Sequence, residues 1–136
     1  MGYTYGMVGD QEKALEYLLK ALKIREKVLP PEHPELAVSY EALGQIYDDL
    51  GQREHALEYM LQALEIRRSA LSPIHPDIAK SHSNVAWAYY YIGDYKHAID
   101  HMRQAVAIAE QSLPQDHPQL VQYRSDLETM ERDSRR

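Results

Sequence analysis

The chain has 136 residues and no cysteine, so we expect a single domain with a modest core, without disulfides or thiolate metal sites. Its 15 Lys and Arg against 21 Asp and Glu give a net charge of −6, which argues against nucleic acid as a partner. The apolar runs are only a few residues long and the first residues lack a signal-peptide pattern. We therefore expect a cytoplasmic protein without a membrane partner.

The dipeptide His-Pro occurs three times, and each copy lies 42 residues after the last. The same shift superposes further sets of identical residues, among them Tyr5, Tyr47 and Tyr89; Gly9, Gly51 and Gly93; Ala14, Ala56 and Ala98; Ala21, Ala63 and Ala105. Self-similarity at a fixed period predicts a solenoid, in which each unit buries its apolar face against its neighbours.

Each unit contains two amphipathic stretches separated by short joints that contain Gly or Pro. Apolar residues recur at steps of three and four, which is the spacing of one helix face. The pattern predicts no strand and about seven helices, near 2-8, 11-29, 35-50, 53-71, 77-92, 95-113 and 119-133. One domain, 1-136, then divides into a truncated repeat over 1-34, full repeats over 35-76 and 77-118, and a terminal capping helix with a polar tail over 119-136.

The repeated histidines His33, His75 and His117 each precede a proline that fits the first position of a helix. We therefore interpret them as helix caps and not as catalytic groups, because copies one repeat apart cannot converge on one site. His97 and His101 have the four-residue spacing of two metal ligands on a helix, but no third ligand lies nearby in the sequence. No metal or other cofactor is expected.

The run Leu43-Gly44-x-x-Tyr47, followed by Gly51 and by Ala56-x-x-x-Met60-x-x-Ala63, resembles the signature of the tetratricopeptide repeat. The 42-residue unit and the Leu-x-x-x-His-Pro joint are similar to the variant found in kinesin light chains. The resemblance covers nearly the whole chain. It implies an all-α, right-handed superhelical solenoid of antiparallel helix pairs, in which the first helix of each pair lines a concave groove that binds peptides or partner helices.

The resemblance also implies which residues line that groove. The first unit keeps only Tyr3, Gly6 and Met7 at matching positions. The candidates from the later units are Glu41, Gln45, Asp48 and Asp49; Lys80, Ser83, Asn84, Trp87, Tyr90 and Tyr91; and Gln122 and Asp126. Two interpretations of Trp87 stay open, because a tryptophan at this place either contacts a partner or packs between repeats.

The family's best-defined peptide site clamps a C-terminal carboxylate with Lys, Arg and Asn side chains. This chain offers only Lys80 and Asn84 for that role and has Glu41 and Asp126 at other matching positions. We therefore expect a basic or neutral peptide with an apolar anchor near Trp87 and with its basic groups near the acidic residues.

Two other functions compete with a peptide-binding scaffold. An enzyme is disfavoured, because the chain has no phosphate-binding glycine loop and no nucleophile elbow. A self-assembling scaffold is the second alternative, because the first helix of the opening repeat is cut short. That remnant is expected to cover only the start of helix 11-29, near Ala14 and Leu18, and to leave Leu22 and Val28 for a second molecule.

Overall fold

A computed structural model describes the backbone of residues 2–136 and the side chains from Asp10 onward. The expected groove residues Tyr3, Gly6 and Met7 therefore lie outside the described side chains. Within this range the chain forms six helices and no strand: α1 (Gly2–Val28), α2 (Pro34–Asp49), α3 (Arg53–Ala70), α4 (Pro76–Ile92), α5 (Tyr95–Ser112) and α6 (Pro118–Ser134). None of these helices has both the length and the apolarity that crossing a membrane requires.

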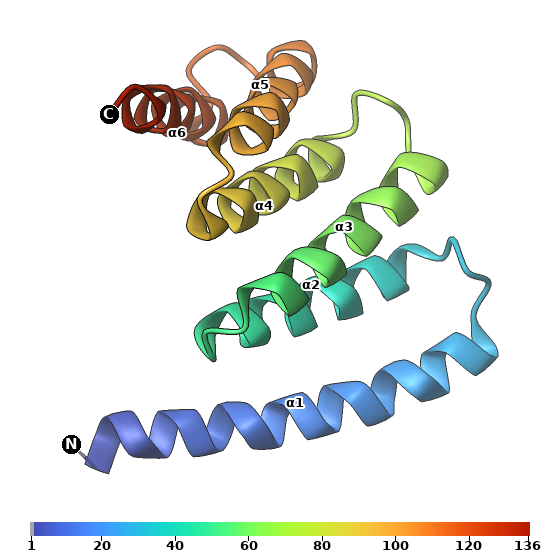
Figure 1. Cartoon of the computed structure of the whole chain (residues 1–136). Coiled ribbons are helices and arrows are strands. Elements are labelled where there is room, and N and C mark those ends of the chain that lie inside the picture. The colour runs from blue at the N-terminus through green and yellow to red at the C-terminus, as the bar shows by residue number, and fades with distance from the viewer. Residues whose placement is uncertain (1) are drawn as a thin grey trace.

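The helices follow one another in space as they do in sequence (Figure 1). The main contacts join α1 to α2, α2 to α3, α3 to α4, α4 to α5 and α5 to α6. This serial packing is typical of a solenoid, because each helix pair buries its apolar face only on adjacent pairs.

The repeated His-Pro joints start three of the helices. The Nδ1 atoms of His33, His75 and His117 accept hydrogen bonds of 3.0–3.1 Å from the backbone N–H two residues later, and a proline follows each at the first helical position. Each imidazole satisfies a backbone donor that the helix itself leaves without a partner. The predicted role of these histidines as caps is confirmed.

The turns inside the pairs depend on glycine. Gly51 and Gly93 have φ values of 81° and 98°, in the left-handed region that glycine adopts at little cost. Their N–H groups bond to carbonyls of the preceding helices, which ends α2 and α4 and lets α3 and α5 turn back.

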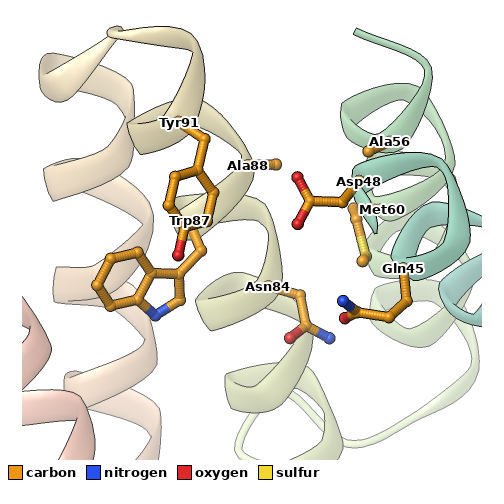
Figure 2. Close-up of a pocket in the computed structure, with 8 residues that line it drawn as sticks. All are labelled: Gln45, Asp48, Ala56, Met60, Asn84, Trp87, Ala88 and Tyr91. Carbon is orange, nitrogen blue, oxygen red and sulfur yellow. The ribbon is translucent and has the colours of Figure 1, made fainter. Parts of the chain in front are cut away.

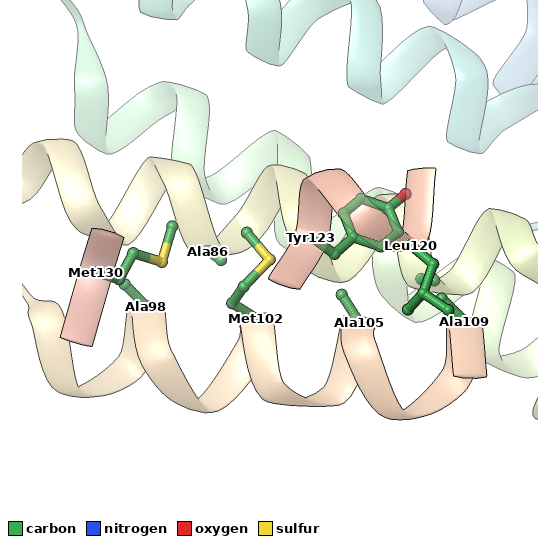
Figure 3. Packing of buried hydrophobic residues seen from close by; sticks show 9 residues of the cluster. Ala86, Ala98, Met102, Ala105, Ala109, Leu120, Tyr123 and Met130 are labelled. Carbon is green, nitrogen blue, oxygen red and sulfur yellow. The ribbon is translucent and has the colours of Figure 1, made fainter. Parts of the chain in front are cut away.

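Small residues bring the paired helices together. Ala56, Ala63, Ala98 and Ala105 are at most 1% exposed. A Cβ added to Gly44 would lie only 3.0 Å from the Cε of Met60, so α2 passes very close to α3 at this point. In the C-terminal half, Met102, Leu120 and Met130 fill the space beside the alanines and are fully buried (Figure 3).

One expected boundary is wrong. Helices were predicted over 2-8 and 11-29 with a break near Gly9, but α1 runs unbroken from Gly2 to Val28, which gives six helices in place of about seven. A separate seven-residue helix would leave many of its backbone N–H and C=O groups without intrahelical partners. A continuous helix pairs these groups, and the glycine at position 9 costs it only about 1 kcal/mol relative to alanine.

Replacing Ala98 by leucine is expected to lower the free energy of unfolding by about 1–3 kcal/mol, because the added atoms enter a filled contact between α4 and α5. Urea denaturation measures the change. The control is Ala14→Leu, at the equivalent position of the opening repeat, where the side chain is exposed and the expected change is below about 0.5 kcal/mol. Equal losses in both variants would contradict the helix pairing described above.

Candidate functional site

A pocket of about 200 Å³ opens where α2 and α3 of the second repeat meet α4 of the third. We call it the inter-repeat pocket. Its lining consists of Gln45, Asp48, Ala56, Met60, Asn84, Trp87, Ala88 and Tyr91. Figure 2 shows Trp87 and Tyr91 on one side, Asp48, Met60 and Gln45 on the other, and Asn84 between them.

Helical spacing brings the polar and aromatic groups to the pocket. Gln45 and Asp48 lie three residues apart on α2. On α4, steps of three and four separate Asn84, Trp87 and Tyr91. Residues at these steps share one face of a helix, so each helix presents its set toward the same space.

The aromatic wall is built by Trp87 and its neighbours. The Trp87 ring lies roughly parallel to that of Tyr91, with centroids 5.8 Å apart and an interplanar angle of 27°, and it meets Tyr90 edge-on at 5.1 Å. Trp87 also packs against the C-terminal core cluster. The ring thus packs between repeats and also lines the pocket, and contact with a partner stays a prediction.

Three of the lining residues were not among the predicted groove residues. Met60 is 6% exposed, and Ala56 and Ala88 are nearly buried. Ala56 and Met60 belong to the second helix of their pair, whereas the groove residues were sought only on the first helices. The small side chains of the two alanines leave the space that the pocket occupies.

Beside the pocket, Glu41 is held in a hydrogen-bonded network. Its carboxylate accepts hydrogen bonds from the guanidinium of Arg67, from the Ser81 hydroxyl at 3.3 Å and from the Asn84 amide at 3.0 Å. Arg67 is 5% exposed and also donates to Ser81 at 2.7 Å. Glu41 therefore joins the two repeats, and its charge is balanced within the protein.

The remaining acidic groups near the pocket differ in their partners. Asp49 accepts hydrogen bonds from Gln11 at 3.1 Å and from Gln45 at 3.4 Å. Asp48 lines the pocket, and among the described side chains its carboxylate takes part in no hydrogen bond or ion pair. Of the three carboxylates of α2 predicted to meet a basic partner, Asp48 is the one that faces the pocket.

The other predicted groove residues lie elsewhere. Lys80 is exposed on the first part of α4, and Ser83 is buried, with 8% of its surface accessible. Tyr90 donates a hydrogen bond to Asp133 of α6, which raises the pKa of the tyrosine. Gln122 and Asp126 bond to each other on α6 at 2.8 Å. The structure thus gathers five of the predicted residues in one pocket: Gln45, Asp48, Asn84, Trp87 and Tyr91.

A second hollow, beside α4 and α5, contains His82. The Nδ1 atoms of His82 and His101 lie 3.0 Å apart, and burial together with the neighbouring His101 lowers the pKa of His82 to about 4. One neutral ring donates to the other, so the pair holds α4 against α5. Within residues 10–136, no three His, Asp or Glu side chains come together as metal ligands.

These features define a helical-repeat solenoid with a pocket between repeats. A family model of the tetratricopeptide repeat matches residues 1–69 and 56–111, and the chain belongs to this family. The fold of this family supports a protein-interaction scaffold. A comparison with curated proteins gave no match.

Solved structures agree with this assignment. A kinesin-light-chain-type protein of Podosopora anserina with nearly identical TPR-like repeats is 29% identical at a TM-score of 0.83, over 94% of this chain and 61% of that one. BtubC from P. vanneervenii is 26% identical at a TM-score of 0.83, and the match covers 93% of this chain and 50% of that one. The chain thus spans between half and two thirds of the length of these two proteins. The predicted all-α, right-handed solenoid of the kinesin-light-chain-like class is confirmed.

A more distant structure shares the fold alone. PcrH, solved in complex with the chaperone-binding region of PopD, is 20% identical at a TM-score of 0.61, over 96% of this chain and 90% of that one.

Proposed function

We propose that the chain is a non-catalytic scaffold of the cytoplasm that binds a peptide or a partner helix at the inter-repeat pocket. The observation that carries the proposal is the convergence of Trp87, Tyr91 and Asp48 on one pocket. Aromatic side chains offer a large contact area, and a polar group beside them fixes the orientation of a ligand. Such aromatic residues often contribute most of the binding energy of an interface. The PcrH structure supports this proposal to the extent that the same fold is in complex with a segment of another protein.

The charge of the site favours a basic or neutral ligand. Asp48 adds a carboxylate that is not balanced by an ion pair among the described residues, and the whole chain carries a net charge of −6. A ligand carboxylate placed here would meet like charge, whereas a cationic group gains attraction. The expected ligand is a basic or neutral segment with an apolar anchor against Trp87.

Trp87→Ala is expected to weaken binding of a peptide selected from a random displayed library by about tenfold or more, because it removes the largest aromatic surface of the pocket. Binding of a basic peptide should also fall between about 0.1 and 1 M salt, as the screening length falls from about 10 to about 3 Å. Isothermal calorimetry gives the affinities, and thermal unfolding checks that the variant folds.

The matched control is Thr129→Ala, at the equivalent position of α6, which does not line the pocket. Its affinity should equal that of the wild type. If Trp87→Ala lost affinity only in proportion to lost folding, Trp87 would be a core residue and the proposed site would be wrong.

A second candidate function is self-assembly through α1, and a row of exposed apolar side chains favours it. Tyr17, Ile24 and Val28 are 73%, 64% and 75% exposed, at helical spacing with Ala14 and Ala21. One repeat later, Ile66 occupies the place of Ile24, is 9% exposed and packs in a core cluster with residues of α2. From Ala14 to Ile24 the row therefore corresponds to a face that is largely covered in the next repeat, whereas Ala70, at the place of Val28, is exposed.

Part of the sequence-based expectation for this face is wrong. Leu22 was expected to lack a partner, but it is 5% exposed, because its side chain points toward α2 and packs with Leu36 and Leu43. The short remnant that was expected to cover Ala14 and Leu18 does not fold back, since its residues extend α1. Val28 is exposed as predicted.

If this row is a contact between two copies, the wild type should form a dimer as its concentration rises. The Ile24→Glu variant should remain monomeric, because burying an unpaired carboxylate in the contact costs too much free energy. Sedimentation over a wide concentration range measures the mass. Val121→Glu, which changes an exposed valine of α6, is the control and should behave as the wild type. A wild type that stays monomeric at every concentration would rule out self-assembly.

A further inference from the structure

The polar lining of the inter-repeat pocket is rich in hydrogen-bond acceptors. Asp48 contributes a carboxylate that no described side chain pairs with. The amide nitrogen of Asn84 donates one N–H to Glu41 at 3.0 Å, and its carbonyl oxygen accepts no hydrogen bond among the described side chains. The nitrogen of Gln45 lies 3.4 Å from Asp49, which likewise leaves its oxygen available. A ligand with several donors can therefore match these acceptors.

The neighbouring carboxylates do not compete for the same ligand. Glu41 already accepts hydrogen bonds from Arg67, Ser81 and Asn84 at its Oε2 atom, and the Arg67 guanidinium balances its charge inside the protein. Asp49 accepts from Gln11 and Gln45. A cation that enters the pocket thus meets its opposite charge at Asp48.

Aromatic and apolar groups complete the site. Trp87 and Tyr91 lie on the wall opposite Asp48, and Met60 lies on the Asp48 side (Figure 2). Tyr91 already holds one guanidinium, because the Cζ of Arg53 lies 5.4 Å from its ring centroid and Arg53 donates to its carbonyl at 2.9 Å. The part of the Trp87 indole that its contacts with Tyr90, Tyr91 and the core leave exposed is then the aromatic surface for a ligand.

We propose that the inter-repeat pocket binds the guanidinium of an arginine side chain in the partner peptide. A guanidinium has five N–H donors in a planar fork, so it can bond to both oxygens of Asp48 while further donors reach Asn84 and Gln45. Its flat face stacks on the indole of Trp87, which a lysine ammonium does less well. The inference rests on the proposed function and narrows it, because the apolar anchor and the basic group become one side chain.

Trp87 is the only tryptophan of the chain, so its single indole N–H resonance reports on the pocket directly. The probes are three capped pentapeptides of alanine whose central residue is arginine, citrulline or leucine. Citrulline keeps the shape of arginine and loses the charge. We expect the arginine peptide to shift the indole resonance in a saturable way, with at least about tenfold weaker binding for the other two.

The matched variants are Asp48→Asn and Asp49→Asn, which remove one charge each from adjacent positions. Asp48→Asn should weaken the arginine peptide by about tenfold or more, whereas Asp49→Asn should change its affinity less than about threefold. Equal binding of the citrulline peptide, or full binding by Asp48→Asn, would overturn the arginine site. So would the lack of any shift at about 20 mM arginine peptide.

These results are separable from those for the proposed function. A leucine peptide that binds best and loses affinity in Trp87→Ala would overturn the arginine site and leave the peptide-binding scaffold supported. The random library carries no bias toward arginine, so it judges the scaffold independently of these three peptides.

Discussion

Arg67 reaches from α3 to the junction of the second and third repeats, where its buried guanidinium contacts Glu41 of α2 and Ser81 of α4. Three helices thus share one charge pair, and Asn84 adds a fourth group from the next turn of α4. A buried ion pair is stable only when its hydrogen bonds are satisfied, so the helices must keep their relative positions. The inter-repeat pocket forms beside this network, between the same three helices.

The other junctions show how the contact varies along the solenoid. One repeat earlier, Arg25 donates to Ser39 in the same relation as Arg67 to Ser81. One repeat later, the buried Ala109 and Tyr123 replace the arginine and the serine, so that junction is held by apolar packing. Among the described repeats, an arginine and a serine that share a glutamate occur together at Arg67, Ser81 and Glu41, beside the inter-repeat pocket.

The repeat period was sufficient to predict the fold, because caps, turns and small contact residues recur at fixed positions. It failed near the N-terminus, where the pattern around Gly9 matched the turns at Gly51 and Gly93, whereas α1 continues through Gly9 as one helix. For the pocket, sequence reasoning placed Trp87, Tyr91 and Asp48 on the right helices. It could not show that Glu41 pairs with Arg67 or that Ser83 is buried, because both depend on how neighbouring repeats are rotated against each other.

A double-mutant cycle on Arg67 and Glu41 tests the central claim, namely that this ion pair fixes the junction on which the pocket depends. Arg67→Met alone should lower the free energy of unfolding by about 3 kcal/mol, because it leaves Glu41 without its counter-charge. In the Glu41→Gln background the same change should cost at least about 1 kcal/mol less. Urea denaturation of the four proteins gives the values. Additive losses within about 0.5 kcal/mol would show that the two residues act independently and would contradict the account.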